Sequence, residues 1–79
     1  MWNDRLRFAE SVEGQWKTFS SDERARLLSA LEVIDENPII GAPLLEPLRG
    51  YWSHRVDGLR IVYRIVTERI IVVVAIAHA

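Results

Sequence analysis

The sequence contains no cysteine, and this absence excludes two classes of protein. Without thiols, neither a disulfide framework nor a thiolate metal site can form. Histidine is also scarce, because His54 and His78 are the only two and stand far apart in the sequence, so they form no zinc-binding motif. We therefore expect neither a metal ion nor another cofactor, and packing must supply the stability of the fold.

Long apolar segments are missing as well. The longest run, Ile70 to Ala77, is much shorter than the ~20 residues that a membrane-spanning helix requires. The N-terminus has no apolar region of the kind found in secretory signals. These features predict a cytoplasmic protein that makes no contact with a membrane.

Length and composition are those of a small globular protein. A chain of 79 residues, of which 49% are hydrophobic and 27% charged, is expected to fold as one domain spanning residues 1–79. A domain of this size buries only ~60% of the surface that its unfolded chain exposes. The core is therefore expected to be small.

Charge is divided unevenly along the chain. Residues 1–48 carry nine acidic and five basic side chains, a net charge of −4, whereas residues 49–79 carry five arginines and two acids, a net charge of +3. A locally cationic segment suits an anionic partner, either nucleic acid or an acidic protein segment. The alternative is that these arginines simply cover a solvated face of a sheet.

The first half of the chain predicts two helices. Apolar residues recur at helical spacing between residues 8 and 19, although Gly14 weakens this first helix. Ser20 and Glu23 have the spacing of a capping box at the start of the second helix. That helix is expected to end near Asn37, because Pro38 disfavours helical backbone in the residue before it. Its apolar stripe consists of Leu27, Leu28, Leu31 and Ile34.

The remaining segments predict strands. Trp2 to Phe8 alternates roughly between apolar and polar residues, as expected for a half-buried first strand. Ile70 to His78 is apolar on both faces and is expected to be a central strand. The order of elements, βααβββ, predicts an α+β fold in which the two N-terminal helices pack on one face of an antiparallel sheet.

Asp57-Gly58 is a strong signal for a two-residue hairpin turn. With this turn, Arg55 lies opposite Arg60, and the period of two sorts the hairpin into two faces. The predicted core face holds Trp52, His54, Val56, Leu59, Ile61, Tyr63 and Ile65. The opposite face holds Tyr51, Ser53, Arg55, Arg60, Val62, Arg64 and Val66.

The predicted pairing of Arg55 with Arg60 suggests a binding site. Two like charges with β-carbons ~5 Å apart are unfavourable unless an anion or a carboxylate lies between them. Guanidinium groups bind phosphate in a bidentate manner and can stabilise the charge of a phosphoryl-transfer transition state. Tyr51 on the same face could stack on a base. The alternative is that Asp57, Glu46 or an acidic residue of a partner neutralises the pair.

His78, at the end of the predicted last strand, is a candidate general acid or base, because imidazole exchanges protons near neutral pH.

Two segments, "LRGYWSHRVDGLRIVYRI" and "RIIVVVAIAHA", resemble the RelE/ParE superfamily of type II toxin–antitoxin toxins. The resemblance covers nearly the whole chain, and its most specific part is the motif from Arg55 to Tyr63. The matching positions are Leu48, Gly50, Trp52, Arg55, Val56, Gly58, Arg60, Tyr63 and His78.

The resemblance implies a RelE-like fold and a toxin that cleaves mRNA on the ribosome. Arg60 matches the family's catalytic arginine, and Arg55 matches a basic position that binds phosphate or helps to activate the 2′-hydroxyl. With His78 they form the expected catalytic set, and the expected nucleic-acid-binding residues are Arg49, Tyr51, Ser53 and Arg64. A cognate antitoxin is the expected protein partner.

The resemblance also implies alternatives to an endoribonuclease. RelE-like toxins are strongly basic and usually carry further basic residues and often a tyrosine after the last strand, whereas this chain has a pI near 6.1. A ParE-like toxin on the same scaffold would instead inhibit DNA gyrase and cleave nothing. A third possibility is a catalytically inactive homologue whose arginine face receives only the antitoxin.

Overall fold

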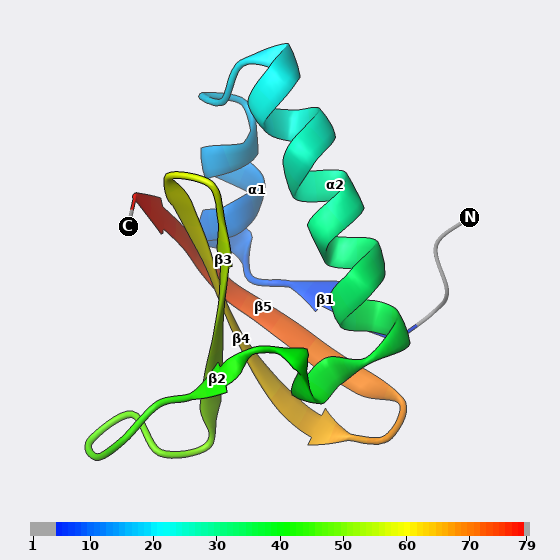
Figure 1. Cartoon of the computed structure of the whole chain (residues 1–79), viewed down its shortest axis with the longest axis vertical. Coiled ribbons are helices and arrows are strands. Elements are labelled where there is room, and N and C mark those ends of the chain that lie inside the picture. The colour runs from blue at the N-terminus through cyan, green and yellow to red at the C-terminus, as the bar shows by residue number, and fades with distance from the viewer. Residues whose placement is uncertain (1–4, 79) are drawn as a thin grey trace.

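Two helices cover one face of a five-stranded sheet in the computed structural model, which describes residues 5–78 (Figure 1). The predicted α+β architecture is confirmed. The elements follow in the order β1 (Leu6–Phe8), α1 (Glu10–Trp16), α2 (Ser21–Glu36), the 3₁₀ helix η1 (Pro38–Ile40), β2 (Ala42–Pro43), β3 (Tyr51–Val56), β4 (Leu59–Thr67) and β5 (Ile70–His78).

The sheet is mixed, and this corrects the expectation of an antiparallel sheet throughout. The strand order is β1-β5-β4-β3-β2, and β1 runs parallel to β5 while the other pairs are antiparallel. Parallel neighbours require a long crossover connection. Here the chain between the two strands includes both helices and β2 to β4, so it is long enough. As predicted, β5 is an interior strand.

The first strand is shorter than the predicted segment Trp2 to Phe8. It begins at Leu6, and Trp2 and Asn3 lie outside the described residues. Leu6 is buried in the core, whereas Phe8 is 39% exposed. The expected alternation is therefore only partly seen.

The core lies between the two helices and the covered face of the sheet. Burial of apolar surface at these positions is the main force that holds the helices against the strands. The buried helical residues are Val12, Leu27, Ala30, Leu31 and Ile34, and those of the strands are Leu6, Leu59, Ile61, Tyr63, Ile71, Val73 and Ile76.

Gln15 fastens α1 to β5. Its side-chain Nε2 donates to the carbonyl of Ile76 at 2.7 Å, and its Oε1 accepts from the N–H of Ile76 at 3.3 Å. The amide thus takes the place of a neighbouring strand where β1 has ended, because β1 pairs with β5 only as far as Val73. This contact fixes the end of β5 against the helix.

The predicted capping box at the start of α2 is present. Ser20 Oγ accepts from the N–H of Glu23 at 3.1 Å, and Glu23 Oε1 accepts from the N–H of Ser20 at 2.8 Å. The helix ends at Glu36 with Asn37 as its C-terminal cap, as the following proline predicts.

Replacement of Ser20 by alanine is expected to lower the free energy of unfolding by about 1 kcal/mol, because α2 loses a side-chain cap. Urea denaturation followed by circular dichroism measures this change. Ser29→Ala, an exposed position within the same helix, is the control and should cost little. Equal losses in the two variants would contradict the role of the cap.

Acid is expected to remove the contribution of Glu23 to this cap. The backbone N–H of Ser20, its hydroxyl and the positive charges of His78 and Arg26 lower the pKa of Glu23. A carboxyl with a lowered pKa in the folded state stabilises above its unfolded pKa, and the effect disappears as the pH falls through the folded value. The difference in stability between wild type and Glu23→Gln should therefore shrink in acid, and a difference that grows would contradict this assignment.

Tyr63 ties the segment after α2 to the centre of the sheet. The fully buried hydroxyl donates to the carbonyl of Pro38 at 2.6 Å and accepts from the N–H of Gly41 at 3.2 Å. Burial raises the pKa of Tyr63, so the phenol keeps the proton that it donates. A Cβ at Gly41 would lie 2.7 Å from the tyrosine oxygen and from the carbonyl oxygen of Ser53, so this close approach requires glycine.

Within residues 5–78, no helix combines the length and apolarity needed to cross a membrane.

Candidate nucleic-acid interface

The β3–β4 hairpin has the predicted register. Arg55 pairs with Arg60, Tyr51 with Arg64, and the turn residue Asp57 has a positive φ of 53°. Aspartate tolerates this left-handed conformation better than most residues, which explains the Asp-Gly turn. The helices cover only one face of the sheet (Figure 1). Arg60 and Arg64 alternate with buried residues in β4, and Arg55 pairs with Arg60, so these arginines lie on the uncovered face.

Cross-strand pairing builds three rows on this open face. Partners directly opposite each other in adjacent strands point to the same side of the sheet. The first row contains Arg55, Arg60 and Ala77; the second contains Ser53, Val62 and Ala75; the third contains Tyr51, Arg64, Val72 and Arg7. We call these three rows the arginine face.

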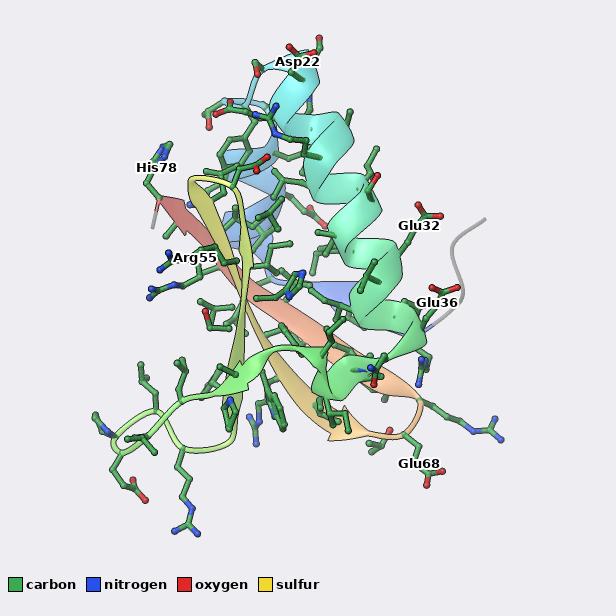
Figure 2. The ribbon with its side chains drawn as sticks, in the orientation of Figure 1. Asp22, Glu32, Glu36, Arg55, Glu68 and His78 are labelled. Atoms are coloured by element: carbon green, nitrogen blue, oxygen red, sulfur yellow. The ribbon has the colours of Figure 1, made fainter. Side chains whose placement is uncertain are left out.

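Arg55 and Arg60 have no acidic partner among residues 5–78. Asp57 pairs instead with Arg26 of α2, with 3.0 Å between Oδ2 and Nε, and Glu46 lies 3.5 Å from Arg49. Both carboxylates expected to neutralise the pair are thus engaged elsewhere. Arg55 extends away from α2, whereas Glu32 and Glu36 project from the other side of the molecule (Figure 2). Two uncompensated guanidinium groups side by side attract an anion.

Arg64 and Tyr51 form a contact of their own in the third row. The Arg64 guanidinium carbon lies 5.9 Å from the centre of the Tyr51 ring, within the range of a cation–π interaction. Tyr51 is half-buried and Arg64 is exposed. Both residues therefore remain candidates for contact with a nucleotide, as the sequence predicts.

Ser53 lies on the arginine face but Arg49 does not. Ser53 stands between Tyr51 and Arg55 in β3, in the row with Val62. Arg49 belongs to the loop before β3, where its side chain is 82% exposed and pairs with Glu46. Only Ser53 is thus positioned by the sheet.

His78 is separated from the arginines. It pairs with Leu59, whose side chain is buried beneath the helices, and its charge acts on Glu23 of α2. The physical reason is a bulge in β5, because Val62 pairs with Ala75 and Tyr63 with Val73, which leaves Val74 as an extra residue. One extra residue reverses the faces of everything that follows it. The structure therefore does not bring the three expected catalytic residues together.

Arg7 is the basic residue of this face that the sequence did not identify as a site residue. It pairs with Val72 of β5, which places it in the third row beyond Arg64. The alternation of the first strand assigns Arg7 to the polar side, but parallel pairing between β1 and β5 carries no short-range signal. The arginine face therefore includes an arginine from the N-terminal strand.

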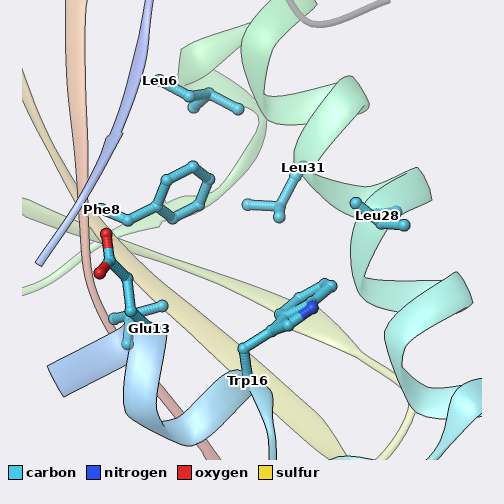
Figure 3. Close-up of a pocket in the computed structure, with 7 residues that line it drawn as sticks. Leu6, Phe8, Glu13, Trp16, Leu28 and Leu31 are labelled. Atoms are coloured by element: carbon cyan, nitrogen blue, oxygen red, sulfur yellow. The ribbon is translucent and has the colours of Figure 1, made fainter. Parts of the chain in front are cut away.

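The helical side carries a different feature, an apolar cleft of about 510 Å³ between β1, α1 and α2 (Figure 3). Among the lining residues that the structure describes, Glu13 is the single charged one. This described lining therefore offers no cation to bind phosphate, and the cleft is distinct from the arginine face. Its lining consists of Leu6, Phe8, Val12, Glu13, Trp16, Leu28 and Leu31.

No group of three or more histidine, aspartate or glutamate side chains suited to a metal ion occurs in the part of the chain that the structure describes.

Solved structures that resemble this chain include toxins and toxin–antitoxin complexes from bacteria and archaea. The RelBE2 toxin–antitoxin complex of Mycobacterium tuberculosis matches with a TM-score of 0.84 and 24% identity, covering 95% of this chain and 96% of that one. The isolated RelE toxin of Escherichia coli gives 0.81 and 25%, covering 98% and 85%. The YoeB–YefM complex of Staphylococcus aureus gives 0.79 and 21%, with 99% of both chains covered. The fold is thus that of RelE-like toxins.

The sequence profile described as "ParE toxin of type II toxin-antitoxin system, parDE" matches residues 3–79. The chain therefore belongs to this toxin family, within the RelE/ParE superfamily. Among curated proteins, no sequence matches significantly. The family description names ParE, whereas the structural neighbours include RelE and YoeB toxins.

Proposed function

We propose that this protein is the toxin of a type II toxin–antitoxin system and that it cleaves mRNA on the ribosome. The observation that carries the proposal is the pair Arg55–Arg60, opposite each other on an uncovered sheet face with no carboxylate partner among residues 5–78. Two guanidinium groups in this arrangement are suited to bind a phosphate group. The similarity to the E. coli RelE toxin, which is 25% identical over 98% of this chain, also supports a RelE-like function.

The reaction that suits this site is attack of a ribose 2′-hydroxyl on the adjacent phosphate. The new bond joins the 2′-oxygen to phosphorus, the bond to the 5′-oxygen breaks, and the products carry a 2′,3′-cyclic phosphate and a 5′-hydroxyl. Arg60 stabilises the charge that grows on the phosphoryl oxygens, and Arg55 holds the phosphate and the 2′-oxygen in position.

Proton transfer needs a group beyond the three rows. The arginine face contains no histidine, aspartate or glutamate within residues 5–78, and His78 lies on the helical side. The 2′-hydroxyl proton therefore leaves to water or to a group of the ribosome, and the departing 5′-oxygen takes up a proton from the same sources to become the 5′-hydroxyl. Positioning and electrostatic stabilisation carry most of the catalysis in this proposal.

A second candidate function is inhibition of DNA gyrase without cleavage. Two observations favour it: the matching family profile describes a ParE toxin, and the formal net charge of −1 provides little general attraction to RNA. In this case the arginine face would bind protein. An inactive homologue that only binds an antitoxin is the third possibility.

The partner proposed for every one of these functions is a cognate antitoxin. Similar structures include the intact RelBE toxin–antitoxin complex of E. coli, 26% identical over 98% of each chain. We place the protein in the cytoplasm, where ribosomes and gyrase are both found.

Induced expression without antitoxin in a bacterial host tests the proposal. Growth should stop, and mapped mRNA ends should reveal cuts within translated reading frames while plasmid supercoiling stays normal. Arrest with intact mRNA and relaxed plasmids would instead identify a gyrase inhibitor. Normal growth would favour the third possibility, an inactive homologue that only binds an antitoxin.

A further inference from the structure

We propose that Arg7 and Arg64 form a second phosphate-binding subsite, which holds the RNA strand at a phosphate other than the one that is cleaved. The inference rests on the proposed endoribonuclease function and assigns a substrate contact to Arg7 in β1. Its basis is the third row of the arginine face, in which Arg7 and Arg64 stand on either side of Val72.

The row brings together two ends of the chain. Arg7 pairs with Val72 through parallel pairing, and Val72 pairs with Arg64 through antiparallel pairing. The two arginines are therefore two strands apart, about 10 Å between their backbones. Their long side chains can converge on one phosphate above Val72, because guanidinium groups stand on flexible stems.

The subsite is too far from Arg60 to serve the same phosphate. Arg60 and Arg64 are four residues apart in β4, which corresponds to about 13 Å along the strand. The two rows must therefore contact different phosphates of one strand. The middle row between them carries small or apolar side chains, Ser53, Val62 and Ala75, over which a ribose or base can lie.

Existing contacts orient both arginines. Arg7 Nη1 donates to the carbonyl of Leu6 at 3.0 Å, and Arg64 lies over the Tyr51 ring at 5.9 Å. Tyr51 thus stands at one end of the row, where a base can stack on it. Val72 is only partly buried and forms an apolar floor between the two guanidinium groups.

Charge and shape favour a single strand of nucleic acid over a folded partner. The row presents cations and an aromatic ring in one line, the combination that tracks a sugar–phosphate backbone and stacks bases. By holding one phosphate, Arg7 and Arg64 would orient the RNA strand so that it runs from the first row of the arginine face to the third. The expected consequence is a gain in binding rather than in the chemical step.

A chemical double-mutant cycle tests the subsite. Ribosomes are programmed with mRNA in which each phosphate around the cut is replaced in turn by an uncharged methylphosphonate. With the wild-type protein, one flanking replacement should lower kcat/KM by about 5–30-fold, and Arg7→Gln should cause a similar loss on unmodified mRNA through KM. Arg7→Gln combined with the methylphosphonate at that position should lower kcat/KM no further than either change alone.

Two control variants and one stability measurement complete the experiment. Arg7→Lys should retain most of the affinity because the charge remains, Arg24→Gln in α2 should have no effect, and urea denaturation should show that Arg7→Gln is folded. The subsite would be overturned if the losses from Arg7→Gln and from the methylphosphonate multiplied at every flanking position, or if Arg7→Gln lowered only kcat. Either result would leave the proposed endoribonuclease activity intact. Unchanged mRNA cleavage by Arg7→Gln, together with weakened antitoxin binding, would also overturn the subsite. It would indicate that Arg7 binds an acidic peptide of the antitoxin instead. Wild-type protein that leaves the mRNA intact would refute the proposed function, and the subsite with it.

Discussion

Replacement of Arg60 by alanine is expected to slow mRNA cleavage by about 10²- to 10³-fold, the usual cost of removing one group that stabilises transition-state charge. Arg60 faces Arg55 directly, and no carboxylate within residues 5–78 engages either side chain. The loss should appear in kcat, because the charge on the phosphoryl oxygens increases during the reaction. Single-turnover cleavage on mRNA-programmed ribosomes measures it.

Stability provides the control for this variant. Arg60 is half-buried with no hydrogen bond or ion pair to another described residue, so its removal should leave the urea midpoint nearly unchanged. Removal of the like charge opposite Arg55 should if anything be slightly stabilising. Arg24→Ala in α2 should keep full activity. An Arg60→Ala protein that is folded and still cleaves at the wild-type rate would exclude Arg60 from catalysis.

Replacement of Tyr63 by phenylalanine is expected to lower the free energy of unfolding by about 1–3 kcal/mol. The change removes only one oxygen, but the carbonyl of Pro38 and the N–H of Gly41 both lose their partner. The segment from η1 to β2 should therefore loosen. Urea denaturation measures the stability, and hydrogen exchange at Gly41 reports the local effect.

Tyr51→Phe is the matched control, since Tyr51 lies on the arginine face and its hydroxyl has no hydrogen bond to a described residue. The same chemical change there should barely affect stability. Equal losses at Tyr51 and Tyr63 would contradict the claim that the buried hydroxyl fastens the loop. A fully protected Gly41 amide in Tyr63→Phe would contradict it as well.

Local signals in the sequence were sufficient to predict the arginine face of the hairpin. The Asp57-Gly58 turn determines which residues are opposite each other, and alternation then separates Arg55 and Arg60 from the core. The capping box of Ser20 and Glu23 is also a local signal, and both of its hydrogen bonds are present. Predictions of this kind succeed because turn and cap chemistry depend on only a few neighbouring residues.

Long-range features could not be predicted in the same way. The alternation of β5 alone assigns His78 to the same face as Val72, but the bulge at Val74 reverses this for the end of the strand. Buried Ile76 shows the same reversal. Parallel pairing of β1 with β5, which brings Arg7 to the site, joins segments more than sixty residues apart in sequence. Neither event has a short-range pattern.

The apolar cleft belongs with these long-range features. Phe8, Trp16 and Leu28 come from three different elements (Figure 3). Phe8 and Leu28 are each 39% exposed. The helical periodicity that predicted a continuous apolar stripe did not reveal that part of this stripe remains open. The separation of this cleft from the arginine face leaves the two surfaces free to bind different groups.

The central claim is that the arginine face acts on RNA phosphate, and cleavage by purified protein tests it most directly. Ribosomes that hold an mRNA with an empty A site are incubated with the protein, and the ends of the mRNA are then mapped. We predict cuts in the A-site codon with 2′,3′-cyclic phosphate and 5′-hydroxyl ends, and cleavage that is about 10²- to 10³-fold slower with Arg60→Ala. The account would be contradicted if this protein left the mRNA intact and, in a separate assay, blocked supercoiling by purified gyrase.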